Sequence, residues 1–455
     1  MVMKASNNES RDSILNELSY ILEKNQITPE LYDRYNVKRG LRNSDGTGVL
    51  VGLTEIGEVH SYVIDEGEKV PVEGRLFYRG YEINDLVTGF QKNGRFGFEE
   101  CCYLLMFGHL PKEDQLAEFT RLLGENRKLQ EGFIEDMVLK APSRDIMNKL
   151  ARCVLASYSY DHEPDDIGIS NTLRQCVELI ARFPSMAAYA YQAKVRYHGN
   201  GSLYIHDPRP ELNTAENILH MIRMDSKYTA SEAEILDLAL VLHAEHGGGN
   251  NSTFVTHVVS SSGTDTYSAI AAAIGSLKGP KHGGANLKVM EMMEDIKNNV
   301  SNWEDEKELQ EYLAKILRKE AYDRTGLIYG VGHAVYTKSD PRAILLKEKA
   351  EQLAQEKGMD KEYRLYATIE RLAPEVFYSV KKSDKVVCAN VDFYSGFVYK
   401  MLNIPIELNT PIFAIARIAG WCAHRIEELI NGGRIIRPAY KSVVGRKQYK
   451  DINER

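Results

Sequence analysis

Apolar residues recur at helical spacing over most of this chain, and one stretch near its start breaks that pattern. Residues 48–84 alternate β-branched residues with glycine turns, which predicts a small meander of strands. Further along, 231–249 (SEAEILDLALVLHAEHGGG) carries apolar residues at i, i+3 and i+4, which predicts an amphipathic helix. We expect Ser231 and Glu234 to form a capping box at its start and Gly247–Gly249 to end it.

The remaining patterns are also helical. Residues 11–36 predict one or two short surface helices, and 170–195 predicts a long helix interrupted at Pro184. Proline lacks an amide hydrogen and clashes with the preceding turn, so we expect a kink or a split there. The fold class we predict is therefore mostly α, with a small N-terminal β meander.

Charge along the chain predicts the domain organisation. Residues 287–321 and 341–380 form charged amphipathic patterns, whereas 410–430 is strongly apolar and is expected to be buried. A chain of 455 residues exceeds the usual size of one core, so we expect two domains. The expected division is an N-terminal helical extension at 1–39, a large helical domain at 40–281 and 395–455, and a small domain at 282–394.

Composition narrows the possible partners. Hydrophobic residues make up 43% and charged residues 27%, as in ordinary globular proteins, and the net charge is −7. A general basic surface for nucleic acid is not expected, so an anionic substrate would need a local cluster of Arg and Lys. No apolar stretch approaches the length of about 20 residues that spans a bilayer, and we expect no membrane partner.

The cysteines and the first residues predict the compartment. The N-terminal stretch mixes acidic, basic and apolar residues, so neither a secretory leader nor a mitochondrial presequence is expected. The six cysteines form no CxxC pair and lie in apolar surroundings, which is typical of reduced thiols in a cytoplasmic protein. They are Cys101, Cys102, Cys153, Cys176, Cys388 and Cys422.

The first candidate motif is HAEHGGGNN. His243 and His246 are three residues apart, so one helix face could present both to a zinc ion. The spacing differs from HExxH and no third ligand is evident, so we expect no metal. The alternative is a pair of side chains favoured by the C-terminal end of a helix dipole. The glycines that follow His246 would let the backbone approach another group closely.

The second motif, GPKHGGAN, places His282 in a turn just before a predicted helix. A helix N-terminus disfavours a protonated imidazole. A neutral His282 could therefore donate a hydrogen bond to a carbonyl that becomes an enolate. The alternative is an ordinary loop histidine.

The third motif, GVGHAVYTKSDPRA, places His333 after two glycines and Arg342 after an Asp-Pro pair. This resembles an anion-binding turn, in which Arg342 could bind a carboxylate in a bidentate manner. In the fourth motif, ANVDFYSGF, Asp392 follows an apolar run. A buried carboxylate must be paired or functional, and a structural hydrogen-bond acceptor is the alternative.

Together the motifs favour one class of chemistry. No GxSxG elbow and no cysteine signature is present, so nucleophilic catalysis fits poorly. Proton abstraction by a carboxylate, assisted by imidazole donors, on an anionic substrate remains.

These motifs, with RLFYRGYEINDL at 75–86 and ARIAGWCAHRIE near the end, occur in the order seen in citrate synthases. The resemblance begins near residue 40. It implies a two-domain helical fold and a homodimer that condenses acetyl-CoA with oxaloacetate and water to give citrate and CoA. Acetyl-CoA would be a cosubstrate, with no tightly bound cofactor.

The resemblance also implies residue roles. Asp392 would be the base, His282 would stabilise the enolate, and His333 would polarise the oxaloacetate ketone. Binding roles would fall to two further groups. Oxaloacetate would contact His246, Asn250, Arg342, Arg417 and, from the partner subunit, Arg437. CoA would contact Gly330, Val331, Gly332, Ala334, Val335 and Lys385.

Three alternatives stay open from the sequence. A 2-methylcitrate synthase using propionyl-CoA would share every motif, because one methylene changes selectivity by only about 1–3 kcal/mol. A non-catalytic relative that binds CoA or citrate would need the arginines but not Asp392. A zinc enzyme would need His243 and His246 as ligands. The sequence also departs from many relatives at Gly247, where they carry glutamate.

Overall fold

The computed structural model describes residues 14–43, 46–66, 68–333, 335–382 and 386–455. It divides into two compact units, 1–53 and 54–455. The first unit contains a helix at 14–23, α2 (Pro29–Arg34) and a 3-10 turn, η1 (Arg39–Leu41). The helices expected at the start of the chain are therefore present, and their apolar side chains in 14–22 are exposed.

A three-stranded antiparallel sheet opens the second unit, as the alternating pattern predicts. It consists of β1 (Gly57–Asp65), β2 (Glu68–Tyr78) and β3 (Tyr81–Glu82), in the order β1-β2-β3. The buried hydroxyl of Tyr78 donates to Val241 O at 2.8 Å, and Ser61 Oγ donates to Val335 O at 2.7 Å. The sheet therefore contacts two segments that are almost a hundred residues apart in sequence.

Helices form most of the rest of the second unit, which confirms the mostly α prediction. They are α3 (Ile83–Lys92), α4 (Phe98–Phe107), α5 (Glu113–Glu125), η2 (Ile134–Leu139), α6 (Ile146–Ser157), η3 (Tyr158–Tyr160), α7 (Ile169–His198), α8 (Thr214–Ile222), α9 (Ala230–His243), α10 (Asn251–Ser260), α11 (Thr266–Lys278), α12 (Ala285–Asn299), α13 (Glu306–Leu317), α14 (Pro341–Lys357), α15 (Asp360–Lys381), α16 (Val391–Met401), η4 (Ile406–Leu408), α17 (Asn409–Ile430) and η5 (Ile452–Glu454).

The caps of α9 differ from the prediction. Its N-cap is Thr229, two residues before Ser231, and Glu232 completes the capping box by accepting the Thr229 amide at 3.0 Å. Glu232 also pairs with Arg223 and Lys357, which fixes this earlier start. The helix ends at His243, so His246 and the glycines lie beyond it rather than on the same helical face.

Of the two outcomes expected at Pro184, a kink or a split, the split does not occur. Helix α7 runs through Pro184 as one element of 30 residues. Pro184 and its neighbours Phe183 and Ser185 are all buried, so packing on all sides of the helix offsets the loss of one backbone hydrogen bond.

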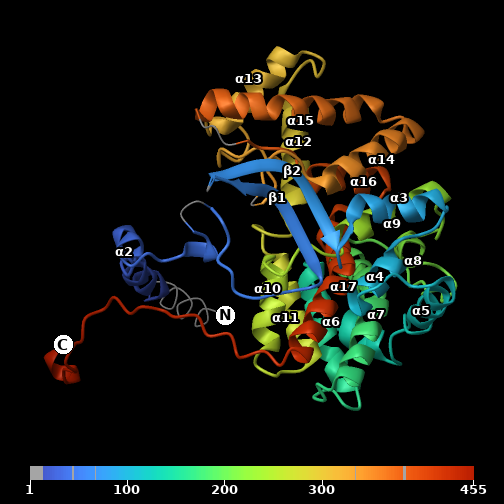
Figure 1. Cartoon of the computed structure of the whole chain (residues 1–455), viewed down its shortest axis with the longest axis horizontal. Coiled ribbons are helices and arrows are strands. Elements are labelled where there is room, and N and C mark those ends of the chain that lie inside the picture. The colour runs from blue at the N-terminus through green and yellow to red at the C-terminus, as the bar shows by residue number, and fades with distance from the viewer. Residues whose placement is uncertain (1–13, 44–45, 67, 334, 383–385) are drawn as a thin grey trace, which may run out of the picture. The chain divides into compact units, whose positions relative to one another are not determined.

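Helix α17 is the core element of the second unit. Its residues Asn409–Glu427 are almost all buried, as the apolar pattern predicts, and it packs against α4, α7, α9, α10 and α11. Figure 1 shows α12–α15 gathered at one end of this unit and α5–α8 at the other, with β1 and β2 between them.

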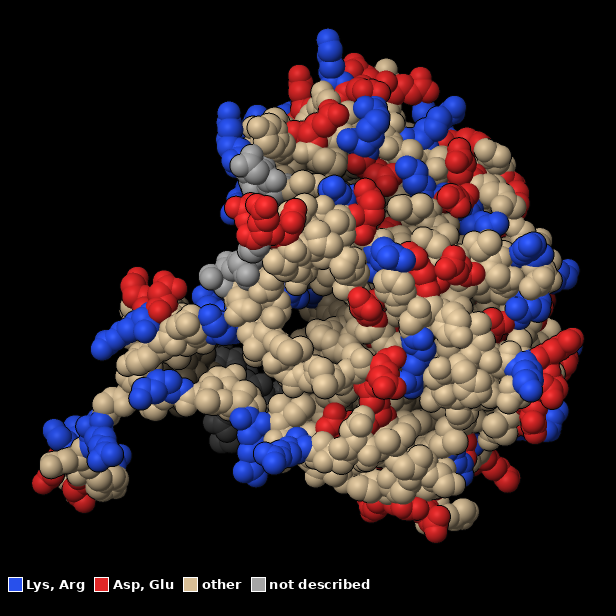
Figure 2. All heavy atoms as spheres, viewed as in Figure 1, with Lys and Arg blue, Asp and Glu red and all other residues tan. Residues whose placement is uncertain are grey.

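Charged side chains of both signs lie on the face seen in Figure 2, in small groups separated by uncharged residues. This face shows no broad basic surface. Across the described ranges, none of the helices is both long and apolar enough to cross a membrane.

Candidate active site

Two segments that carry candidate residues are hydrogen-bonded to each other. The Gly332 amide donates to Cys388 O at 2.7 Å, and the Asn390 amide donates to Gly330 O at 2.8 Å. The Asn390 side chain also donates to Gly332 O at 2.9 Å. The turn that contains His333 and the start of α16 are thereby held in one short antiparallel bridge.

Gly330 makes this bridge possible. Its φ is +77°, in the left-handed region that side chains rarely adopt. A Cβ there would lie 2.8 Å from Val289 and 2.9 Å from Phe393, so both conformation and space require glycine.

His333 has a fixed proton position. Its Nδ1 accepts the amide hydrogens of Val335 at 3.0 Å and Tyr336 at 3.1 Å. A nitrogen that accepts two amide hydrogens cannot itself carry one, so the imidazole is neutral with its hydrogen on Nε2. The turn therefore presents His333 as a neutral donor.

Asp392 lies in the first turn of α16, after the N-cap Asn390. Burial raises its pKa from 3.8 to about 6, partly opposed by the positive charge of Arg342 and Arg417 and reinforced by Asp340. A carboxyl group with this pKa is largely ionised at neutral pH and is a stronger base than an ordinary aspartate.

Arg342 is buried and anchored by its own N-cap residue. Its Nε donates to Asp340 Oδ1 at 3.0 Å and its Nη2 donates to Asp340 Oδ2 at 2.8 Å. Asp340 also accepts the Val391 amide at 3.2 Å, which joins α14 to the start of α16. The guanidinium next to Asp392 is therefore fixed in orientation.

Arg417 is fully buried on α17 but only partly satisfied. Its Nε donates to His243 O at 2.7 Å, and its guanidinium lies 4.8 Å from the Phe413 ring. Within the described chain its two terminal nitrogens have no hydrogen-bond partner. Burial lowers its pKa to about 10, so the group stays charged at neutral pH. Two buried, charged donors without an acceptor favour an anionic ligand.

His246 lies beside the turn that carries His333. Its ring lies 5.2 Å from that of His333 and 5.5 Å from that of Tyr336. Burial lowers its pKa well below 6.5, and the positive charges of Arg342 and Arg417 lower it further. A neutral imidazole therefore lies within the electrostatic influence of two arginines, and its Nε2 has no hydrogen-bond partner among the described residues.

His282 approaches from the turn between α11 and α12. Its Nε2 lies 3.0 Å from Ser252 Oγ, and that oxygen also accepts the Trp421 Nε1 hydrogen at 3.1 Å. Burial lowers the pKa of His282 to about 4, and Arg417 lowers it further, so the imidazole is neutral. Asn250, the N-cap of α10, accepts from Ser252 Oγ at 3.0 Å.

Not every candidate is placed in this group. Arg437 is exposed in the segment after α17, and among the described residues no hydrogen bond or ion pair joins it to these side chains. Ala334 and Lys385 lie outside the described residues, while Val331 and Val335 belong to the bridged turn.

The zinc hypothesis for His243 and His246 does not fit this geometry. His243 Nδ1 lies 2.7 Å from Ala239 O and burial lowers its pKa to about 3, so its ring is fixed within α9 as a core residue. Among the described residues, neither histidine belongs to a group of metal-ligating atoms.

Three residues that support the site have no role assigned to them from the sequence. They are Ser252, which holds His282, Asp340, which anchors Arg342, and Tyr336, whose ring lies 5.0 Å from that of His333. Asp340 directly before Pro341 is a recognisable N-cap signal, whereas the contact between Ser252 and His282 joins segments 30 residues apart and leaves no local pattern.

Comparison with known proteins agrees with this geometry. The family model described as "Citrate synthase, C-terminal domain" matches residues 44–439. A citrate synthase of Haloferax volcanii is 36% identical over 408 residues, which cover 88% of this chain and 94% of the relative. A 2-methylcitrate synthase of Shewanella oneidensis is 34% identical over 378 residues, covering 82% and 90%.

Solved structures give the same result. A citrate synthase from Pyrobaculum aerophilum has a TM-score of 0.72 at 29% identity, covering 90% of this chain and 94% of that one. A citrate synthase from Thermoplasma acidophilum, solved with carboxymethyl coenzyme A and oxaloacetate, has a TM-score of 0.74 at 25% identity, covering 92% and 99%. The fold, the motif order and the relatives agree, and the chain belongs to the citrate synthase family.

Proposed function

We propose that this protein is a citrate synthase, an acyltransferase that condenses acetyl-CoA with oxaloacetate and water to give citrate and CoA. The observation that supports this most is the buried guanidinium of Arg417, whose terminal nitrogens lack acceptors beside the neutral His246. A dicarboxylate such as oxaloacetate supplies those acceptors and compensates the buried charge.

Oxaloacetate would be held by Arg417, Arg342 and His246, with Asn250 nearby. Arg342 is oriented by Asp340, so its fork loses little freedom when it binds a carboxylate. His333 would donate its Nε2 hydrogen to the ketone oxygen and transfer that proton to the alkoxide that forms.

Asp392 would remove a proton from the acetyl methyl group. The thioester C–H is a very weak acid, so the developing enolate needs a hydrogen bond as it forms. His282 would donate that bond from Nδ1, which requires the one hydroxyl hydrogen of Ser252 to turn from Asn250 Oδ1 to His282 Nε2. The enolate carbon then attacks the ketone carbon polarised by His333, and water cleaves the resulting thioester to release CoA.

The CoA site would be formed by the bridged turn, Gly330–Val335, and by Lys385. The glycines of this turn expose backbone groups to a ligand, and the lysine would supply positive charge for phosphate. Acetyl-CoA would act as a cosubstrate, with no tightly bound cofactor.

The working unit would be a homodimer in the cytoplasm. Arg437 is exposed, so its guanidinium is accessible to a second subunit, which supports a role in the partner's site. Six free cysteines support a reducing compartment. We also propose that 282–394 forms a small domain and that 40–281 with 395–455 forms the large one, with 1–39 as an extension.

The test is release of free thiol from acetyl-CoA, measured with and without oxaloacetate. We expect release only with oxaloacetate, and its loss in Asp392→Ala. Thiol release that ignores oxaloacetate, or an unaffected variant, would contradict the proposal.

A second candidate is a 2-methylcitrate synthase, because the Shewanella oneidensis relative carries that name at 34% identity. The ratio of kcat/KM for acetyl-CoA to that for propionyl-CoA separates the two, and a ratio well below one would favour the second. Binding of CoA and citrate without any turnover would instead identify a non-catalytic relative.

A further inference from the structure

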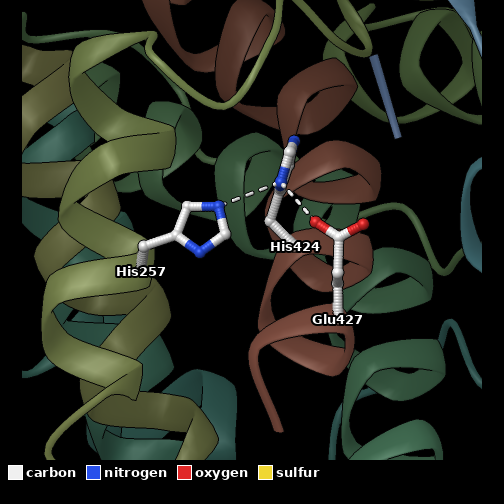
Figure 3. A group of neighbouring side chains, drawn as sticks. All are labelled: His257, His424 and Glu427. Carbon is white, nitrogen blue, oxygen red and sulfur yellow. Dashed lines mark hydrogen bonds and ion pairs between the residues drawn. The ribbon is translucent and has the colours of Figure 1, made fainter. Parts of the chain in front are cut away.

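A second group of titratable side chains lies outside the residues assigned above. His257 of α10 faces His424 and Glu427 of α17, and Figure 3 shows the three side chains pointing toward one another. One ligand atom from each residue lies within 4.8 Å of the other two. His424 is fully buried, and Glu427 exposes 9% of its side chain.

The distances match a metal ion. His257 Nε2 and His424 Nδ1 lie 3.1 Å apart, and His424 Nδ1 lies 3.7 Å from Glu427 Oε2. Two ligands at 2.0–2.1 Å from a tetrahedral Zn²⁺ are about 3.3–3.4 Å apart. The two distances that involve His424 Nδ1 are therefore within a few tenths of an ångström of this spacing, and His257 Nε2 and Glu427 Oε2 lie within 4.8 Å of each other.

Each of the three side chains has a partner that orients it. Glu428 Oε2 lies 2.8 Å from His257 Nδ1, and Glu245 Oε1 lies 3.1 Å from His424 Nε2. Both histidines thus have a carboxylate on the nitrogen that faces away from the shared centre, as zinc-binding histidines do. The Glu55 amide donates to Glu427 Oε1 at 2.8 Å and leaves the other oxygen directed at His424.

That other oxygen is the independent sign of a missing ligand. Within the described chain Glu427 Oε2 is buried and has no hydrogen-bond partner, and Oε2 of Glu245 is in the same state. Three carboxylates, those of Glu245, Glu427 and Glu428, surround two imidazoles here. Against the effect of burial, Glu245 and Glu427 raise the pKa of His424 to about 9, so its imidazolium offsets part of this negative charge in the metal-free protein. A bound cation would take over that role.

We propose that His257 Nε2, His424 Nδ1 and Glu427 Oε2 bind a divalent transition-metal ion, with Zn²⁺ as the best match and water as the fourth ligand. Two imidazoles and one carboxylate form a donor set that Zn²⁺ accepts readily. Both facing nitrogens must be free of hydrogen when the ion is bound, so the ion takes the place of the proton they otherwise share. The ion would join α10 to α17 next to the Ser252–Trp421 hydrogen bond.

The test uses untagged full-length protein. Protein is stripped with a chelator, desalted, incubated with Zn²⁺, desalted again and analysed for metal, and affinity is measured by competition with a chromogenic chelator. We expect one Zn²⁺ per chain in the wild type and in His198→Gln, a control histidine exposed at the end of α7.

Three variants separate ligand roles from folding. His257→Gln and Glu427→Gln remove ligands and should weaken Zn²⁺ binding more than about 100-fold, while Glu428→Gln removes only an orienting partner and should weaken it about 10–100-fold. Urea unfolding without metal shows whether each variant still folds, and Zn²⁺ should raise the Tm of the wild type but not of His257→Gln.

Two results would overturn the proposal. The first is wild-type protein that retains no Zn²⁺, which would mean that the two imidazoles simply share a proton. The second is Zn²⁺ bound as tightly by folded His257→Gln as by the wild type, which would place the ion elsewhere.

Discussion

Replacing Asp392 by asparagine should make the protein more stable while removing its activity. The carboxyl group is buried next to Asp340, and burial raises its pKa from 3.8 to about 6. Folding therefore has to offset the cost of keeping a charge there at neutral pH. A difference of about two pKa units corresponds to about 3 kcal/mol at pH 7, which the neutral amide would recover as an upper value.

The stability advantage of Asp392→Asn over the wild type depends on pH. Below pH 3.8 the carboxyl group is protonated in both folded and unfolded chains, so the variant gains nothing. From pH 3.8 to about 6 the unfolded chain ionises first, and the wild type loses stability by up to about 1.4 kcal/mol per pH unit. Above pH 6 the advantage of Asp392→Asn should be constant.

Equilibrium urea unfolding at pH 4, 5, 6 and 7, at one protein concentration, measures this difference. Asp340→Asn is the matched control, since it breaks the buried pair with Arg342 and should cost about 3–5 kcal/mol. The variant Asp392→Asn should also lose about 10²–10⁴-fold in kcat. An Asp392→Asn protein no more stable than the wild type at pH 7, or an advantage that does not grow between pH 4 and 6, would refute the reasoning.

Three further outcomes test the site. Arg417→Lys keeps the charge but loses the planar guanidinium, so KM for oxaloacetate should rise about 10–100-fold while KM for acetyl-CoA stays the same. Steady-state kinetics measures both, and an unchanged KM for oxaloacetate would contradict the assignment. Ser252→Ala removes the hydroxyl that orients His282 and should lower kcat about 100-fold with little change in KM for oxaloacetate. A fall in kcat together with a similar rise in KM for oxaloacetate would instead indicate a general packing defect. Mixed dimers of Arg437→Ala and Asp392→Ala subunits should recover about a quarter of wild-type activity if sites are shared, and no recovery in proven heterodimers would count against sharing.

The sequence predicted the helices well because their signals are local. The amphipathic pattern of 287–321 became α12 and α13, and the apolar run at 410–430 became α17. Boundaries were less certain, because competing caps lie close together. The N-cap of α9 is Thr229 rather than Ser231 because Glu232 completes the capping box with Thr229. Glu232 is held there by Arg223 and Lys357, and Lys357 is distant in sequence.

The sequence identifies candidate residues by their type, whereas their protonation and hydrogen bonding can be read only from the structure. The sequence pointed to His333 but could not assign its hydrogen to Nε2, since that depends on two amides in a turn. It pointed to Arg417 without showing that two of its nitrogens are buried and unpartnered. It gave no sign of His257 and His424, because 167 residues separate them.

The small sheet has a mechanical consequence. Tyr78 fastens one part of it to the end of α9, and Ser61 fastens another part to the turn after His333. The strands thus connect α9, which leads to His246, with the turn that carries His333, so a relative movement of these two segments must also move the sheet. Near that turn, a Cβ on Gly74 would lie 2.2 Å from Ser339 O. The same methyl group would lie 2.6 Å from the Tyr336 ring, which packs against His333, so a side chain at position 74 would displace the turn that carries His333.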